Sequence, residues 1–158
     1  MRTKKVLFIR QAIELSQKSL SNQGLGPFGA IIVRDNQIIG QGWNQVVACN
    51  DPTAHAEIIA IRDACLYLAT FNLQGCTLYS SCEPCPMCLG AAYWARLDSI
   101  VYGATRQDAA EAGFDDEFFY QDICSPPAAR TIHMQQDLRD EAKEVLRHWA
   151  QASDRTRY

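Results

Sequence analysis

Residues 76–102 read CTLYSSCEPCPMCLGAAYWARLDSIVY and contain three candidate elements in a row. Cys76–Ser81 is typical of a buried strand, and Ser99–Tyr102 is typical of a second one. Between them, Pro84 suits the first turn of a helix that runs to about Arg96. A strand, a helix and a strand within so short a stretch form a crossover unit, which joins parallel strands covered by helices. The sequence therefore predicts an α/β fold around this unit.

The chain before this unit supplies the remaining layers. Helical spacing of apolar residues among charged ones indicates two helices, and two β-rich runs between them are separated by Asp35-Asn36, which predicts a hairpin. The side chain of Asp51 or Thr53 is expected to cap the second helix. The elements expected here are, in chain order, a helix over 4–21, strands over 30–34 and 37–43, and a helix from the segment 50–53 to about 69. Together with the crossover unit they predict a three-layer α/β/α sandwich with a mixed central sheet.

The character of the chain changes after Gly103. Residues 108–122 contain six carboxylates and neither Lys nor Arg, and Pro126-Pro127 forms a stiff joint. From about Leu138 the apolar residues again have helical spacing. No repeat or Gly/Ser-rich linker marks a second domain, so we expect one domain over residues 1–158. A C-terminal helix after the proline joint can pack on its own domain or on a partner chain.

Composition limits the class of protein. The 158 residues are 47% apolar and carry 15 Lys and Arg against 18 Asp and Glu, which indicates one folded domain and excludes a wholly disordered chain. A net charge of −3 gives no general attraction to nucleic acid. The longest apolar run, 28–33, is far below the roughly 18 residues of a membrane helix, and the N-terminus does not resemble a signal peptide. Seven cysteines are an odd number and too few for a secreted disulfide scaffold, so we expect a cytoplasmic protein in which some of the thiols bind a metal.

Two short motifs, His-Ala-Glu and Pro-Cys-Pro-Met-Cys, carry the chemistry. The two-residue gap between Cys85 and Cys88 lets both thiolates bind one zinc ion from the opening of a helix, where the helix dipole favours the thiolate form. His55 in the first turn of the preceding helix is the expected third ligand. Three protein ligands leave the fourth position to water, as in catalytic zinc sites. Glu57 is then placed to accept a proton from this water and return it to a leaving amine, which is hydrolytic deamination.

Other interpretations of these thiols stay open. Cys82 lies three residues before Cys85, which is the spacing of an iron–sulfur run, but Ala92 stands where the fourth cysteine of such a run is expected. A closed structural zinc site would need Cys49, Cys76 or Cys82 as a fourth ligand. In that case the chain would be a zinc-stabilised binding module without turnover.

The extended motif resembles the cytidine-deaminase-like superfamily, and within it the chain is most similar to the bacterial guanine deaminases. The pattern H-x-E followed by P-C-x-x-C belongs to the zinc nucleobase deaminases. The resemblance covers most of the chain and rests on Gly26–Ala30, Asn44, Asn50–Glu57, residues 81–95 and Glu111–Asp116.

This resemblance implies a role for each matching residue. One zinc ion per subunit would be bound by His55, Cys85 and Cys88, and Glu57 would move protons. Asp116 would contact the guanine edge and assist proton transfer. The substrate-contacting residues would be Phe28, Asn44, Ala56, Trp94, Asp116 and Tyr158.

The resemblance also implies an assembly. Similar enzymes exchange their C-terminal segments between two subunits, so residues from about 126 to 158 are expected to be exchanged within a homodimer. Tyr158 occupies the terminal position that would close the pocket of the partner.

Guanine is the expected substrate for a physical reason as well. Its edge presents N1–H and an exocyclic amino group, both donors that a carboxylate can accept, whereas N1 of adenine is itself an acceptor. The acidic stretch 108–122 offers such carboxylates and would repel a tRNA backbone. We therefore expect attack of water on C2, protonation of N3 by Glu57, and release of xanthine and ammonia, with a small purine base as partner and neither nucleic acid nor a membrane. A tRNA adenosine deaminase is the alternative of the same fold, as is a deaminase of guanosine, another aminopurine or an aminotriazine.

Overall fold

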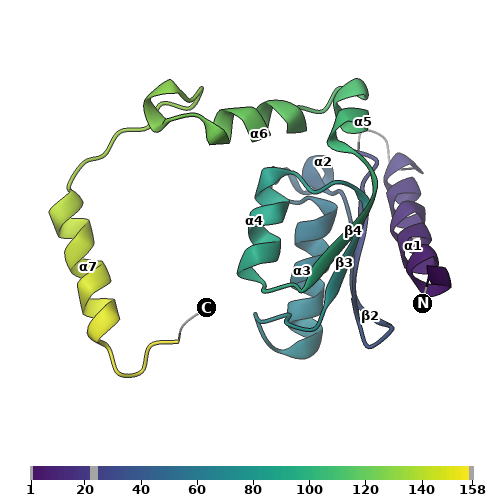
Figure 1. Cartoon of the computed structure of the whole chain (residues 1–158), viewed down its shortest axis with the longest axis horizontal. Helices are drawn as coiled ribbons and strands as arrows, with labels where there is room; N and C mark the ends of the chain where they lie inside the picture. Colours follow the sequence, from purple (N-terminus) through teal and green to yellow (C-terminus); the bar gives the residue numbers. More distant parts are fainter. Residues whose placement is uncertain (1, 22–24, 157–158) are drawn as a thin grey trace. The chain divides into compact units, whose positions relative to one another are not determined.

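The computed structural model describes residues 2–21 and 25–156. The chain forms two compact units, one up to Tyr120 and one from Gln121 onward. The first unit is built on a four-stranded sheet (Figure 1). Its elements are α1 (Arg2–Ser21), β1 (Gly29–Arg34), β2 (Gln37–Trp43), α2 (Val46–Cys49), α3 (Ala56–Leu68), β3 (Thr77–Cys82), α4 (Pro86–Trp94), β4 (Ser99–Ala104), α5 (Arg106–Glu111) and the start of α6 (Asp116–Cys124).

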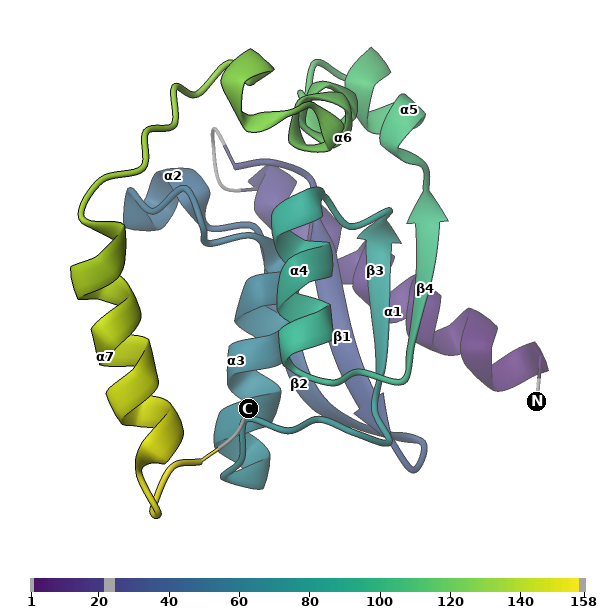
Figure 2. The same ribbon diagram turned by 60° about the vertical axis from the view of Figure 1, so that its left-hand side comes forward.

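The sheet has the strand order β2-β1-β3-β4 (Figure 2). Strand β1 is antiparallel to β2 and to β3, whereas β3 and β4 are parallel, as the crossover unit requires. The hairpin between β1 and β2 turns through Asp35 and Asn36, whose φ angles of 50° and 63° are both left-handed. Two left-handed residues match the right-handed twist of the flanking strands, and Asn and Asp tolerate this conformation. The predicted hairpin and mixed sheet are confirmed.

Helices cover both faces of the sheet, with α1 on one side and α3 and α4 on the other (Figure 1). The alternation of side chains along β1 divides the core accordingly. Ile31 and Val33 belong to the buried cluster under α1, whereas Ala30 and Ile32 belong to the larger cluster under α3. The predicted three-layer α/β/α sandwich is confirmed.

Two glycines in β2 let α3 lie directly on the sheet. A Cβ atom at Gly40 would be 2.4 Å from the carbonyl oxygen of Ala60, and one at Gly42 would be 2.4 Å from that of Ala56. Both distances are far below van der Waals contact, so only glycine permits this approach. The packing fixes the first turn of α3, which carries Glu57, against β2.

The start of α3 corrects one prediction. Neither Asp51 nor Thr53 caps this helix. The carboxylate of Asp51 accepts hydrogen bonds from the backbone N–H of Thr53 at 2.8 Å and from its hydroxyl at 2.7 Å, which closes a turn before the helix. The N-cap is His55, whose side chain makes no capping hydrogen bond. Its imidazole is therefore left for another partner.

The start of α4 corrects another prediction. The helix begins at Pro86 and not at Pro84, with Cys85 as its N-cap. A residue that precedes proline is disfavoured in helical conformation, and Cys85 is extended with ψ at 168°. Pro86 then occupies the first helical position, where a missing N–H costs nothing.

The second unit contains the end of α6, a 3₁₀ turn at Pro127–Ala129 and α7 (Arg139–Gln151). The helix predicted from about Leu138 is confirmed as α7. Asp122 also organises this unit, because its carboxylate accepts hydrogen bonds from the N–H and the hydroxyl of Thr131, each at 3.0 Å. Within the described residues, no helix is both long enough and apolar enough to cross a membrane.

Candidate active site

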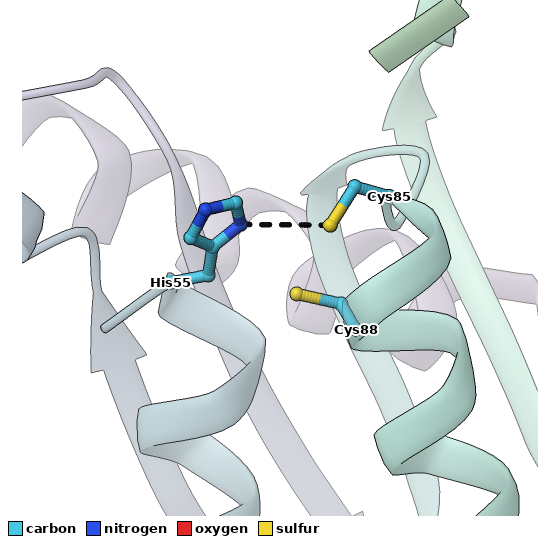
Figure 3. A group of neighbouring side chains, drawn as sticks. All are labelled: His55, Cys85 and Cys88. Atoms are coloured by element: carbon cyan, nitrogen blue, oxygen red, sulfur yellow. Dashed lines mark hydrogen bonds between the residues drawn. The ribbon is translucent and has the colours of Figure 1, made fainter. Parts of the chain in front are cut away.

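Three side chains from two helix starts converge on one point. His55 is the N-cap of α3, Cys85 is the N-cap of α4, and Cys88 lies in the first turn of α4. Figure 3 shows the imidazole and the two sulfur atoms turned toward one another. The Nδ1 atom of His55 is 3.6 Å from Sγ of Cys85, and the three ligand atoms all lie within 4.8 Å of one another.

This donor set fits zinc. Thiolate and imidazole are typical zinc ligands, at about 2.3 Å for sulfur and 2.0–2.1 Å for nitrogen. In a tetrahedral arrangement, ligands at those distances lie roughly 3.6 Å apart, which is the observed separation of His55 and Cys85. No other group of three or more potential ligands occurs in the part of the chain that the structure describes. Three ligands leave one tetrahedral position for water or substrate.

The pKa values of the two thiols favour binding of a cation, because one of the thiols is already ionised at neutral pH. The neighbouring Cys88 thiol, and to a smaller extent His55, lower the pKa of Cys85 to about 4. The pKa of Cys88 is raised, because the Cys85 thiolate beside it and burial both disfavour a second negative charge. The pair therefore carries one thiolate before a metal binds, and binding releases the second proton.

Glu57 lies beside the ligands and is only 5% exposed. One carboxylate oxygen accepts a hydrogen bond from the hydroxyl of Ser80 at 3.0 Å, and the other accepts one from the Cys88 thiol at 3.4 Å. Burial raises the pKa of Glu57. A carboxyl group in such surroundings exchanges a proton closer to neutral pH than an exposed one, as a proton-transfer group requires.

A cavity of about 270 Å³ opens onto this cluster. Of the described residues that line it, none is Lys or Arg, whereas Glu57, Glu83 and Asp116 are acidic. The ring of Phe28 meets that of Phe114 edge to face, with centroids 4.7 Å apart, and forms an apolar wall. The cavity is lined by Gly26, Phe28, Asn44, Val46, Val47, His55, Glu57, Glu83, Cys85, Phe114 and Asp116.

Two polar side chains of the cavity wall, Asn44 and Asp116, are far apart in the sequence. Asn44 follows β2 directly and is buried, and its carbonyl oxygen accepts the N–H of Val46 at 3.3 Å. Its amide N–H groups are the donors left for a ligand. Asp116 is the first residue of α6, and its pKa is raised by partial burial and by the negative charge of the Cys85 thiolate.

Two of the predicted substrate-contacting residues, both within the described part of the chain, do not line the cavity. Ala56 is fully buried and is not a lining residue. Trp94 is 62% exposed and ends α4. A helix of nine residues is roughly 13 Å long, which separates Trp94 from the ligands at the other end. Tyr158 lies outside the described residues.

Sequence analysis missed several wall residues. Glu83 lies inside the cysteine motif, but the motif alone does not predict a place for it in the cavity wall. A charged residue between a buried strand and a proline is the one local sign that it faces the site. Val46 and Val47 lie on α2, which was not predicted because four residues are too few to establish a helical period.

The sequence and the structure of the chain are similar to those of known zinc-binding deaminases. Residues 2–104 match the family described as cytidine and deoxycytidylate deaminase zinc-binding region. Guanine deaminase of Bacillus subtilis (strain 168) is 48% identical over 152 residues, which cover 96% of this chain and 97% of that protein. The X-ray structure of guanine deaminase from Bacillus subtilis superimposes with a TM-score of 0.91 at 47% identity, over 96% of this chain and 97% of that one. The tRNA-specific adenosine deaminase of Haemophilus influenzae is 41% identical over 114 residues, or 70% of this chain and 64% of that protein.

Proposed function

The chain belongs to the cytidine and deoxycytidylate deaminase family, and on that premise we propose that it hydrolyses guanine to xanthine and ammonia. The observation that carries the proposal is the extent of the match to guanine deaminase, which covers 96% of the chain and so includes Asp116. The match to the tRNA-specific adenosine deaminase covers only 70%. The enzyme is a zinc-dependent hydrolase of C–N bonds.

Proton transfer falls to Glu57. His55, Cys85 and Cys88 would hold the zinc ion, which when bound would lower the pKa of a water molecule and supply a nucleophile at neutral pH. The carboxylate of Glu57 accepts one proton of this water as its oxygen bonds to C2 of guanine, and delivers that proton to N3. Glu57 then moves the remaining hydroxyl proton to the amino nitrogen. The C2–N bond breaks, ammonia leaves and C2 becomes the carbonyl of xanthine.

Recognition of guanine follows from the polar groups on the cavity wall. The carboxylate of Asp116 is an acceptor for donors on the guanine edge, and the amide N–H groups of Asn44 are donors for its ring nitrogens or carbonyl. Phe28 and Phe114 offer an apolar wall to the flat base. The volume of about 270 Å³ is near the lower end of ligand pockets and suits a single base.

The charge of the cavity disfavours a nucleic acid substrate. The wall holds acidic residues and no Lys or Arg among those described. A tRNA substrate binds largely through phosphate contacts with basic side chains, so this wall would repel it. A neutral base with several N–H donors has no such cost.

The assembly and the compartment are further parts of the proposal. We infer that the protein is a homodimer in which residues from about 126 to 158 are exchanged, with Tyr158 closing the partner's cavity. What supports this is the character of α7, whose apolar residues Val145, Leu146 and Trp149 are exposed and would be covered by a partner. Reduced thiols suit the cytoplasm, where we place the enzyme. Removal of residues 126–158 should then give a monomer in light scattering, and an unchanged dimer would contradict the exchange.

The test of function is ammonia release from a panel of bases and nucleosides. Zinc-loaded protein should release ammonia from guanine and form xanthine, with far slower or no release from adenine, adenosine, cytosine and cytidine. Guanosine is the informative comparison, because its ribose must fit the same small cavity. Activity on adenosine in tRNA without activity on guanine would overturn the proposal.

A further inference from the structure

Four interactions join the end of β3 and the segment after it, which carries Cys85, to the end of β4 and the residues that follow β4. The N–H of Glu83 donates to the carbonyl of Ala104 at 2.9 Å, and the carboxylate of Glu83 accepts the N–H of Arg106 at 3.1 Å. The thiol of Cys82 donates to the carbonyl of Thr105 at 3.5 Å. The fourth interaction comes from α6: the hydroxyl of Tyr120 donates to the carbonyl of Pro84 at 2.7 Å.

The hydrogen bond from Tyr120 to Pro84 links two segments that each contribute residues to the cavity wall. Pro84 is buried and immediately precedes the metal ligand Cys85. Tyr120 lies four residues after Asp116 in α6, so the two side chains leave the helix on the same face. The bond therefore fixes the helix face that presents Asp116 relative to the segment that presents Cys85.

Arg106 contacts the ring of Tyr120 and so supports its hydrogen bond to Pro84. Its guanidinium lies 4.7 Å from the centre of the Tyr120 ring, and its Nε is 3.0 Å from a carboxylate oxygen of Glu117. The ion pair is partly exposed and contributes little by itself. The guanidinium nevertheless restricts the ring, so the hydroxyl of Tyr120 is held in place for the carbonyl of Pro84.

We propose that Tyr120 is a positioning residue for Asp116, acting through its hydrogen bond to the carbonyl of Pro84. Tyr120 is not among the residues that line the cavity. Its hydroxyl sets the distance between the Asp116 carboxylate and the metal ligands, on which substrate orientation depends. The inference rests on the proposed function, because it gives Asp116 a part in turnover.

The test is a double-mutant cycle on the full-length, zinc-loaded enzyme. Tyr120→Phe keeps the ring and removes only the hydroxyl. It should lower kcat/KM for guanine about fivefold, the usual worth of one hydrogen bond, without loss of zinc. In an Asp116→Asn background the same substitution should change kcat/KM by less than about twofold, because the residue it positions is already impaired. Tyr102→Phe, which alters an exposed tyrosine on β4, is the matched control and should change nothing.

A second readout does not depend on activity. In Tyr120→Phe, the amide hydrogens of residues 116–120 should exchange faster with solvent, while those of α3 keep their protection. Equal loss of kcat/KM in both backgrounds, loss of zinc in Tyr120→Phe, or unchanged exchange at residues 116–120 would each overturn the inference. A wild-type enzyme inactive on guanine would refute the proposed function instead, and amide exchange would still decide whether Tyr120 anchors α6.

Discussion

Replacing Gly42 by alanine is expected to lower both the stability and the activity of the enzyme. The new Cβ would lie 2.4 Å from the carbonyl oxygen of Ala56 and 2.8 Å from the backbone nitrogen of Ala60. Normal contact is about 3.5 Å, so the first turn of α3 must move by roughly 1 Å. Overpacking of this kind costs about 1–3 kcal/mol. Because that turn carries His55 and Glu57, a shift of about 1 Å should also lower kcat up to about 100-fold.

Gly90→Ala is the matched control, since it makes the same chemical change in α4. Nothing lies within 4 Å of a Cβ at this position. Alanine in a helix interior is favoured over glycine by about 0.5–1 kcal/mol, so this variant should be slightly more stable than the wild type. Urea unfolding followed by far-ultraviolet circular dichroism gives both free energies. A Gly42→Ala variant as stable as the wild type, or a Gly90→Ala variant that is equally destabilised, would refute the packing argument.

Three further variants test the metal, the proton transfer and a helix cap. Cys85→Ser should lose zinc and turnover while Cys49→Ser, at an exposed cysteine, keeps both; full zinc content in Cys85→Ser, measured by atomic absorption, would contradict the ligand assignment. Glu57→Gln should retain zinc but lose about 10²–10⁴-fold in kcat, because no group remains to carry the proton; near-normal turnover would remove Glu57 from the mechanism. Asp108 accepts the N–H of Thr105 at 2.7 Å, which holds its pKa below the ordinary 3.8. Asp108→Ala should therefore have a lower free energy of unfolding than the wild type at pH 7. This difference should shrink as the pH falls below 3.8, because the wild-type carboxylate is then protonated. A difference that is the same at every pH in urea titrations would rule out this electrostatic origin.

The sequence predicts most of the fold because its strongest local signals agree with the tertiary structure. The pair Asp35-Asn36 specifies a tight hairpin, and the crossover unit specifies a parallel strand pair whatever surrounds it. Helix starts are less predictable where several candidates stand together. At Pro84 and Pro86 both prolines suit a first turn, and the extended conformation of Cys85 decides for the second.

The cluster of His55, Cys85 and Cys88 with Glu57 beside it was predictable, because each of the two motifs is short and its residue types have specific chemistry. The cavity wall depends on how separate segments come together, which spacing does not encode. Glu83 and Phe114 reach the cavity from different segments of the chain. Trp94 was expected there, but the length of α4 carries it away from the ligands. Four residues of α2 give no periodic signal, although they bring Val46 and Val47 to the wall.

The most direct test of the account follows oxygen from solvent into product. Zinc-loaded enzyme is incubated with guanine in water enriched in oxygen-18, and the product is analysed by mass spectrometry. We expect xanthine with one heavy oxygen atom at C2 for each ammonia released, formed about 10²–10⁴-fold more slowly by the Glu57→Gln variant. Xanthine without the label, or no xanthine at all, would contradict hydrolytic deamination at this centre.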